Sequence, residues 1–385
     1  MSVEAEQIID AIRTVLGDGE YALHEPNLSE IDHTTLQDCL NSGFVSSVGQ
    51  YVDTFESELS KYTGAKYAIA VVNGTAALHL ALVCAGVKPK HEVITPSLTF
   101  VGTANAISHA GATPHFVDVE ESTFGIDPVR LRVYLGENTA STPNGLINKH
   151  SGNRISALVP VHIFGHPCQI DALRDIANEF DLALVEDAAE ALGSFYKGQH
   201  AGTFGRAGIL SFNGNKIITT GGGGAILTDD DELAALAKHL STTAKVMGTT
   251  QSDHDAIGYN YRLPNINAAL GCSQLTKLND YLASKQRLAG KYKETFSTYE
   301  GAQFIDSPDH CSSNFWLQTI RLFGSDQDKL YETIECLNKE GLGARPLWKP
   351  LHTTIPYHDC PRDSLPITES LAKQLINLPS SAGLV

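Results

Sequence analysis

The sequence lacks the cysteine patterns that hold together small secreted proteins and zinc modules. Its seven cysteines are scattered, odd in number and without any Cys-x-x-Cys pair. This pattern argues against a disulfide framework and a zinc site, and it fits a reducing cytosol. We therefore expect a cytoplasmic protein without a bound metal.

Long apolar runs and basic runs are also missing. No window approaches the roughly 18 consecutive apolar residues that a membrane helix needs. The first residues, MSVEAEQIIDAIRTVLG, contain acids and no apolar core of a signal peptide. The formal net charge is −16 without a long run of Lys or Arg, which argues against a nucleic-acid or membrane partner and leaves room for a local phosphate pocket.

Short β-branched runs alternate with helical patterns from about residue 66 to 230. In segment 170–180, Leu173, Ile176 and Phe180 fall at the spacing of an amphipathic helix. Strands that alternate with helices predict a mostly parallel sheet covered on both faces, with ligands beyond the carboxyl ends of its strands. The predicted strands are 68–72, 92–95, 115–119, 156–161, 182–187, 208–212 and 224–228.

The pattern changes past about residue 245. A long helix with Leu288, Tyr292 and Phe296 on one side precedes an aromatic strand over 314–322 and a helix around 326–340. At 385 residues the chain can form one large domain and a smaller one. We predict an α/β protein in three parts: an N-terminal helix and arm (1–60), a large domain with the parallel sheet (61–245), and a long helix with a small α+β domain (246–385).

The stretch NGTAALHLAL (73–82) follows the first predicted strand. A glycine turn leads into a helix that Thr75 opens. Free N–H groups and the dipole at a helix start suit a phosphate, and the Thr75 hydroxyl adds a donor. An ordinary strand–turn–helix cap explains this stretch equally well.

Asp187, in VEDAAEALGS, ends another apolar strand. A carboxylate in that place is costly unless it meets a cation or a strong donor. A helix N-cap is the plainer interpretation of the same residue.

Lys216, in SFNGNKIITTGGGG, is the one charged residue of segment 211–224. A lysine at a strand end among uncharged neighbours loses its proton more easily, and the neutral amine is the form that Schiff-base chemistry requires. Ser211 can give a second hydroxyl to a phosphate, while the four glycines fit a close approach of backbone before the next strand. Taken alone, a surface loop explains this lysine.

The three features gain meaning together. A phosphate cradle, then an acid, then a lysine on one sheet is the order expected of a pyridoxal 5'-phosphate site of the aspartate-aminotransferase fold, type I. In such a site Asp187 keeps the pyridine nitrogen protonated, and Lys216 holds the aldehyde as an imine.

Long motifs in register extend the likeness over nearly the whole chain. On them the chain resembles the sugar-nucleotide aminotransferases of the DegT/DnrJ/EryC1/StrS family. SFNGNK and DAAEALGS are most similar to the subgroup that makes 4-amino sugars for bacillosamine or legionaminic acid. The chain stops at LPSSAGLV where relatives run on, which concerns the outer face of the small domain and not the chemistry. The motifs are FVSSVGQYVDTFE, NGTAALHLAL, EVITPSLTFVGTANAI, PVHIFGHPCQID, VEDAAEALGS, SFNGNKIITTGGGGAILT and GYNYRLPNINAALGCSQL.

The resemblance implies roles for individual residues. Lys216 is similar to the family's Schiff-base lysine and Asp187 to its pyridinium partner. Gly74, Thr75 and Ser211 match the phosphate-binding positions.

Further positions follow from the same resemblance. Phe100 matches the aromatic residue that stacks on the cofactor ring. Asn260 matches a residue that reaches the phosphate of the neighbouring subunit, which implies a homodimer with shared active sites. Glu190 occupies a variable position near the cofactor, and His162 lies near the cofactor face or is a packed strand histidine.

The resemblance also implies a ping-pong reaction. L-Glutamate gives its amino group to the cofactor, and a UDP-linked 4-keto-6-deoxy-2-acetamido sugar then accepts it, with Lys216 moving the proton in each half. Of the alternative functions, amination at C3 of a related ketosugar is the nearest to this one. A sugar 3-dehydrase carries histidine in place of Lys216, and a non-catalytic dimer would not need to retain the five residues Thr75, Asp187, Ser211, Lys216 and Asn260.

Other sequence patterns are weaker evidence for a functional site. GxxxxGK[ST] is absent, and GTFGRAG (202–208) has only an accidental dinucleotide-like spacing. His162 and His166 lie four residues apart without an evident third ligand, so we expect no zinc pair. Arg345 and Trp348 either shape the substrate mouth or pack the small domain.

Overall fold

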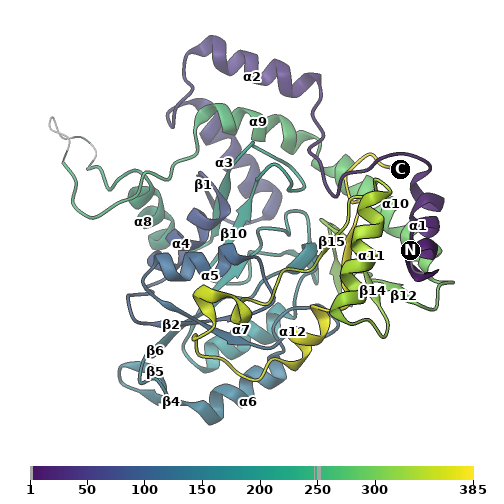
Figure 1. Cartoon of the computed structure of the whole chain (residues 1–385). Helices are drawn as coiled ribbons and strands as arrows, with labels where there is room; N and C mark the ends of the chain where they lie inside the picture. Colours follow the sequence, from purple (N-terminus) through teal and green to yellow (C-terminus); the bar gives the residue numbers. More distant parts are fainter. Residues whose placement is uncertain (1–2, 247, 249–252) are drawn as a thin grey trace.

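The computed structural model describes residues 3–246, 248 and 253–385 (Figure 1). A nine-stranded sheet forms its centre, with the main order β1-β11-β10-β7-β6-β2-β3. Neighbouring strands from β10 to β3 pair in parallel, and β11 alone of this path runs antiparallel to both neighbours. The predicted mostly parallel sheet is confirmed. Its strands are β1 (Tyr67–Val71), β2 (Glu92–Pro96), β3 (Thr113–Val117), β4 (Thr139–Thr142), β5 (Gly145–Asn148), β6 (Arg154–Leu158), β7 (Ala183–Asp187), β10 (Ala207–Ser211) and β11 (Gly224–Thr228).

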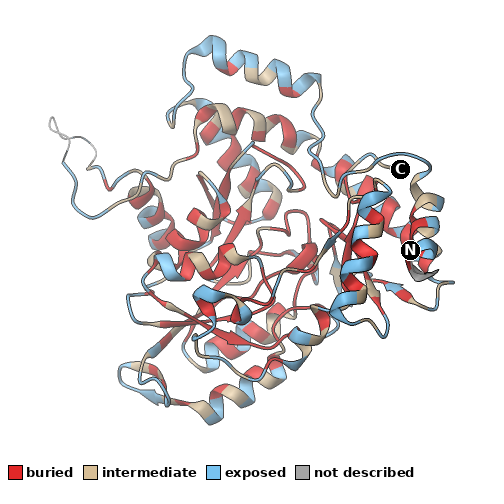
Figure 2. Ribbon diagram, viewed as in Figure 1, coloured by how far each residue is buried: buried red, intermediate tan, exposed pale blue. Residues whose placement is uncertain are grey.

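Helices cover both faces of this sheet, because successive strand residues point to opposite sides. Ile69 and Val71 of β1 pack toward α4, α5 and α8, whereas Ala68 and Ala70 pack toward α3. Helices α6 and α7 cover the second face near β2, β3 and β6. Figure 2 shows the strands buried between these layers. The helices are α3 (Gln50–Thr63), α4 (Gly74–Cys84), α5 (Val101–His109), α6 (Pro128–Asn138), α7 (Ile170–Glu179) and α8 (Asp231–Ser241).

A second, antiparallel sheet lies in the C-terminal part of the chain, in the order β12-β14-β16-β15. Leu288, Tyr292 and Phe296 of α10 face its core, together with Ile8 and Ile12 of α1, so the first helix packs beside the C-terminal elements (Figure 1). These elements are α1 (Val3–Leu16), α10 (Leu278–Phe296), β12 (Ala302–Phe304), β14 (Gln318–Leu322), α11 (Gln327–Lys339), β15 (Arg345–Pro346), α12 (Pro366–Leu371) and β16 (Leu375–Leu378). A small sheet of β8 (Phe195–Tyr196), β9 (Gln199–His200) and β13 (Cys311–Ser312) completes the strands within the described part of the chain.

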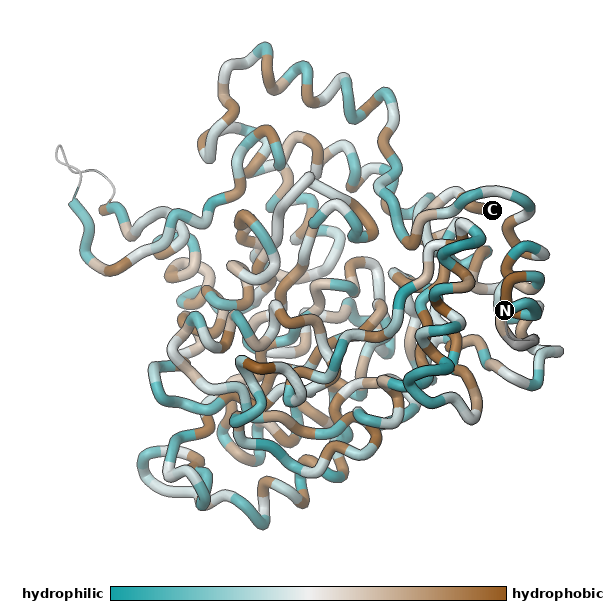
Figure 3. The backbone as a smooth tube through the Cα atoms, in the orientation of Figure 1, coloured by the Kyte–Doolittle hydropathy of each residue, from teal (hydrophilic) through white to brown (hydrophobic). Residues whose placement is uncertain are grey.

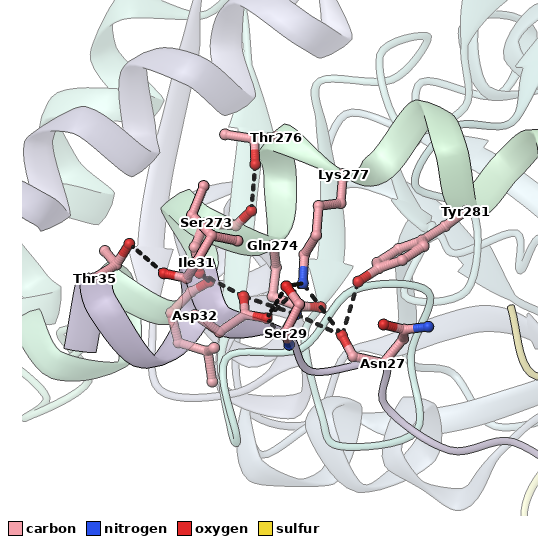
Figure 4. A network of polar contacts seen from close by, with 11 residues as sticks. Asn27, Ser29, Ile31, Asp32, Thr35, Ser273, Gln274, Thr276, Lys277 and Tyr281 are labelled. Atoms are coloured by element: carbon pink, nitrogen blue, oxygen red, sulfur yellow. Dashed lines mark hydrogen bonds and ion pairs between the residues drawn. The ribbon is translucent and has the colours of Figure 1, made fainter. Parts of the chain in front are cut away.

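Helices α2 (Glu30–Ser42) and α9 (Asn265–Thr276) lie together at one end of the molecule. Their link is Asp32, a buried carboxylate of α2 that accepts hydrogen bonds from Ser273, Gln274 and Lys277 (Figure 4). Asp32 is an exception, because most hydrophilic stretches lie at the periphery of the molecule, as Figure 3 shows.

The predicted aromatic strand over 314–322 is wrong in its first half, because β14 begins only at Gln318. Asn314 instead donates from Nδ2 to the carbonyl oxygens of Glu190 and Leu192, at 2.8 and 2.9 Å. Phe315 adopts a φ of 46°, far from the φ of about −120° to −140° that is typical of strand residues. Tertiary hydrogen bonds therefore replace strand pairing in this segment.

Within the described ranges, no helix combines the length and the apolar character needed to cross a membrane. The division into three parts that the sequence predicts (1–60, 61–245 and 246–385) stays a prediction.

Candidate active site

The carboxyl ends of β1, β7 and β10 open onto one cavity of about 340 Å³. Parallel strands place their carboxyl ends at one edge of a sheet, which is where ligands bind in such folds. Seven of the eight cofactor-site residues predicted from the sequence line this cavity. They are Gly74, Thr75, Phe100, Asp187, Glu190, Ser211 and Lys216.

The start of α4 forms one wall of the cavity. Asn73 caps the helix by accepting the Ala76 N–H at 2.8 Å, which leaves the N–H groups of Gly74 and Thr75 without a partner inside the helix. A Cβ at Gly74 would lie 3.0 Å from Cβ of Ser211, so the glycine allows the helix start to approach the end of β10. Two hydroxyls and two N–H groups thus meet at a helix N-terminus, which suits a phosphate.

The four-glycine run supports this wall from behind. Gly224 opens β11, and a Cβ there would lie 2.5 Å from the carbonyl carbon of Asn73 and 2.7 Å from the nitrogen of Gly74. The interpretation of the run as a close approach of backbone therefore agrees with the geometry at Gly224.

Asp187 lies buried at the end of β7. Its Oδ2 accepts a hydrogen bond from the Thr103 hydroxyl at 2.8 Å, and its Oδ1 accepts the Ala189 N–H at 3.2 Å. Burial raises the pKa of Asp187, and the hydrogen bonds from Thr103 and Ala189 oppose that rise. A buried carboxylate of this kind gains most from a cationic partner such as a protonated ring nitrogen.

Lys216 points its amine at a carboxylate and an indole ring. Its Nζ lies 3.4 Å from Oε1 of Glu190 and 3.8 Å from the centroid of the Trp316 ring. Trp316 is fixed in turn by the hydrogen bond that its Nε1 donates to the carbonyl of Asn215, at 2.6 Å. The lysine is therefore held on a defined platform inside the cavity and is no surface loop residue.

Glu190 is buried beside this lysine. Its Oε2 accepts the N–H of Phe164 at 2.8 Å. Burial raises the pKa of Glu190 to about 7, against the opposing effects of the Lys216 ammonium and the Phe164 N–H.

Aromatic rings close the remaining side. Trp348 stacks on Phe164 at a centroid distance of 5.5 Å and on Trp316 at 6.4 Å. Phe100 is half exposed and lies 6.4 Å from Trp348. Trp348 and Arg345, for which the sequence left two interpretations, both line the cavity.

Sequence reasoning missed Thr103, Phe164 and Trp316 as site residues. Trp316 falls in the segment 314–322 that the sequence predicts as a strand, which carries no sign of a site residue. Phe164 belongs to a three-residue turn, Ile163–Gly165, whose backbone direction no local pattern reveals. Thr103, three residues after Phe100, was the one with a signal, since it follows the motif PSLTF on a helix start.

Asn260 lies apart from this cavity in the single chain. It is exposed and lines a second, larger hollow of about 1150 Å³, beside Ser47, Tyr67 and Arg262. His162 is buried next to Asp187. Its backbone N–H donates to the backbone carbonyl of Asp187, and its ring Nε2 lies 3.0 Å from Oε2 of Glu186. Among the residues that the structure describes, no group of three or more His, Cys, Asp or Glu could hold a metal ion.

Pyridoxal phosphate fits the groups that line the cavity. The helix start with Thr75 and Ser211 offers donors for a phosphate, Asp187 offers a buried anion for a ring nitrogen, and Lys216 offers an amine for a carbonyl. The absent Cβ of Gly74 and Gly224 is what lets these groups come together.

Comparison with known proteins identifies the family of the chain. The DegT/DnrJ/EryC1/StrS aminotransferase family model matches residues 26–385. GDP-perosamine synthase of Caulobacter vibrioides is 36% identical over 362 residues, 93% of this chain and 92% of that protein. The solved structure of DesI with its TDP-sugar product superposes with a TM-score of 0.81 at 31% identity, covering 94% of this chain and 88% of DesI. The PLP form of Spr1654 from Streptococcus pneumoniae gives 0.84 at 26% identity, covering 94% of each chain.

The fold and the family match define a pyridoxal-phosphate-dependent aminotransferase of the aspartate-aminotransferase fold, type I. The chain belongs to the DegT/DnrJ/EryC1/StrS aminotransferase family.

Proposed function

We propose that the chain transfers the amino group of L-glutamate to C4 of a UDP-linked 4-keto-6-deoxy-2-acetamido sugar. The observation that carries the proposal is the meeting of Lys216, Asp187 and a phosphate-binding helix start in one cavity. The UDP-4-ketosugar is the acceptor of the subgroup that SFNGNK and DAAEALGS resemble.

Each residue then has a task. Gly74, Thr75 and Ser211 hold the phosphate, and Asp187 keeps the ring nitrogen protonated. Bound pyridoxal phosphate supplies an electron-withdrawing ring and a carbonyl carbon for amine exchange. Lys216 would take the proton from the α-carbon of the donor and pass it to the cofactor in one half-reaction. In the other it would take that proton back from the cofactor and give it to C4 of the sugar.

Cofactor capture tests the first part of the proposal. The full-length chain should bind pyridoxal phosphate, and borohydride reduction should fix the cofactor to the peptide that contains Lys216, as mass spectrometry can show. Lys216→Ala should abolish this covalent fixation. A chain that is labelled on another lysine, or not at all, would remove the basis of the proposal.

The acceptor is tested with a substrate panel. Protein loaded with pyridoxal phosphate is incubated with glutamate and with UDP-, GDP- and dTDP-linked 3- and 4-ketosugars, and NMR of each product locates the new nitrogen. We expect turnover of the UDP-linked 4-ketosugar. Reaction of only C3 ketones would favour the C3 aminotransferase, and turnover of none would revive the non-catalytic homologue.

A GDP-linked ketosugar is the second candidate acceptor. It is favoured by the 36% identity with GDP-perosamine synthase over 93% of this chain. A preference for the GDP sugar in the same panel would leave the chemistry at Lys216 unchanged and replace UDP in the proposal.

The second hollow supports a shared active site. Asn260 lies on the surface there, and we infer that it reaches the cofactor phosphate of a partner subunit in a homodimer. Exposed apolar residues near the hollow, Val48 (68% exposed) among its lining and Ile257 (90%) close to Asn260 in sequence, are the kind of surface that a partner covers.

A further inference from the structure

Glu190 is a carboxylate in direct contact with the reacting lysine. Its Oε1 lies 3.4 Å from Lys216 Nζ, and both side chains are nearly buried, at 6% and 13% exposure. Solvent screens such a buried pair only weakly, so the protonation state of one group strongly affects the pKa of the other.

The orientation of Glu190 is fixed from two sides. Its Oε2 accepts the N–H of Phe164, and its backbone carbonyl accepts Nδ2 of Asn314, both at 2.8 Å. Phe164 itself has a φ of 58°, in the left-handed region that is unfavourable for a bulky residue. Because this strained turn directs an N–H at Oε2, Oε1 is left to face the lysine.

The other contact of the lysine cannot replace Glu190. The Trp316 ring attracts an ammonium group through its π face, but it accepts no proton near neutral pH. Among the residues that the structure describes, Glu190 is thus the base in contact with Nζ.

We propose that Glu190 is the proton partner of Lys216: it takes the proton that the lysine ammonium must lose before the amine reacts with a carbonyl, and it returns that proton afterwards. An N–H bond of Lys216 breaks and an O–H bond forms at Oε1 of Glu190. The ion pair becomes a neutral pair, so the step needs no other reagent. This inference rests on the proposed chemistry of Lys216.

The charges around the pair suit such an exchange. Burial raises the pKa of Glu190 to about 7, and a carboxyl group that titrates near neutral pH exchanges protons in both directions. Asp187 on β7 adds to the rise of this pKa and Lys216 opposes it, and both effects are included in the value of about 7. Arg345 of β15 lines the same cavity, and His24 of the N-terminal arm lies within electrostatic range of Lys216.

A purely structural acceptor for Phe164 is the alternative, and Glu190→Gln separates the two roles. The amide oxygen of glutamine can still accept the Phe164 N–H. Its NH₂ group would then face Lys216, which places a donor opposite a donor and removes the base.

The test uses the tryptophan emission of the full-length chain. The chain has two tryptophans, Trp316 and Trp348, and both line the cavity. In a Trp348→Phe background all indole emission comes from Trp316, on whose ring Lys216 Nζ lies. We expect a pH titration to show a step near pH 7, which Glu190→Gln removes and Glu190→Asp retains at a shifted pH.

The step needs neither cofactor nor substrate, so it separates this inference from the proposed function. An unchanged step in Glu190→Gln, or no step in the parent, would overturn the proton partnership even if the chain transaminates. A normal step in a chain that fails to capture pyridoxal phosphate would instead overturn the proposed function. Circular dichroism of each variant checks that it is folded.

Capture kinetics give a second readout. The rate of pyridoxal phosphate capture at pH 7 should fall at least about tenfold in Glu190→Gln and recover in part in Glu190→Asp. Equal capture rates and equal pH profiles in the parent and in Glu190→Gln would contradict the proposal.

Discussion

Single side chains of the cavity owe their chemistry to burial. Asp187 and Glu190 are both carboxylates with raised pKa, yet their partners differ: Asp187 meets the Thr103 hydroxyl, whereas Glu190 meets the Lys216 amine. Environment therefore assigns two roles to one kind of group.

Asp187→Asn should lower kcat/KM for amino transfer roughly 100-fold or more, because a neutral amide cannot hold a ring nitrogen protonated. Thr103→Val should lower kcat/KM less, by about 1.5 kcal/mol or roughly tenfold, the low end of what a hydrogen bond to a charged group contributes. Loss of that hydrogen bond also raises the pKa of Asp187 further, so the acidic limb of the kcat/KM profile should move to higher pH. An unchanged pH profile in Thr103→Val would contradict this assignment.

Glu190→Gln should change the pH dependence of stability. The pKa of Glu190 is raised from 4.5 to about 7 in the folded chain. Since the folded state holds the proton more tightly, wild-type stability falls as pH rises from about 4.5 to 7, by an amount on the order of 3 kcal/mol. The variant lacks this loss, so its stability relative to wild type should be higher at pH 8 than at pH 4, as urea unfolding can show. A difference independent of pH would show that Glu190 is not the group responsible.

At the scale of elements, the proposed phosphate cradle depends on how closely β11 approaches the start of α4. Gly224→Ala places a Cβ at 2.5 Å from the Asn73 backbone, which must push the two elements apart. We expect pyridoxal phosphate affinity to fall at least about tenfold, with a loss of stability of about 1–3 kcal/mol. Equilibrium binding and urea unfolding measure these two effects.

Gly214→Ala is the matched control. Gly214 lies in the same motif, and a Cβ there meets nothing within 4 Å. Its stability should stay within about 0.5 kcal/mol of wild type, with cofactor affinity unchanged. Equal effects of the two substitutions would show that the close approach at Gly224 is not what forms the cradle.

Helix α2 is attached to α9 through Asp32. Burial alone would raise the pKa of Asp32, but hydrogen bonds from Lys277, Ser273 and other donors outweigh it and lower this pKa from 3.8 to about 2. The ionised Asp32 and its donors therefore stabilise the fold above about pH 4, and this stabilisation is lost as pH falls toward 2. Asp32→Asn should lower the free energy of unfolding by about 2 kcal/mol at pH 7 and by much less at pH 2.5.

Hydrogen exchange of α2 should show the local effect of Asp32→Asn. Ser273→Ala removes one of the donors and should cost less at pH 7, about 1 kcal/mol. A loss in Asp32→Asn that is as large at pH 2.5 as at pH 7 would mean that packing, and not charge, holds α2 in place.

For the whole molecule, the proposed homodimer can be tested because Asn260 lies outside the Lys216 cavity of its own chain. Lys216→Ala and Asn260→Ala chains should each be impaired alone. When they are unfolded together and refolded, random pairing should restore about a quarter of wild-type activity, since half of the dimers carry one intact site. No recovery on mixing would place Asn260 outside the partner's active site.

The sequence by itself determined the sheet and the order of the chemistry along it. β-Branched runs alternating with helices specify a parallel sheet through local propensity and periodicity, and strand ends then place Gly74, Asp187, Ser211 and Lys216 at one edge. These features are local, so they could be predicted.

Only the tertiary structure decided what surrounds those residues. Trp316 under Lys216, the Phe164 N–H on Glu190 and Thr103 on Asp187 join segments far apart in the chain, or turns that depend on one strained φ angle. Long-range hydrogen bonds from Asn314 to the carbonyls of Glu190 and Leu192 likewise explain why β14 begins at Gln318 and not at residue 314. Contacts of this kind depend on how the whole chain packs, and no window of sequence contains both partners.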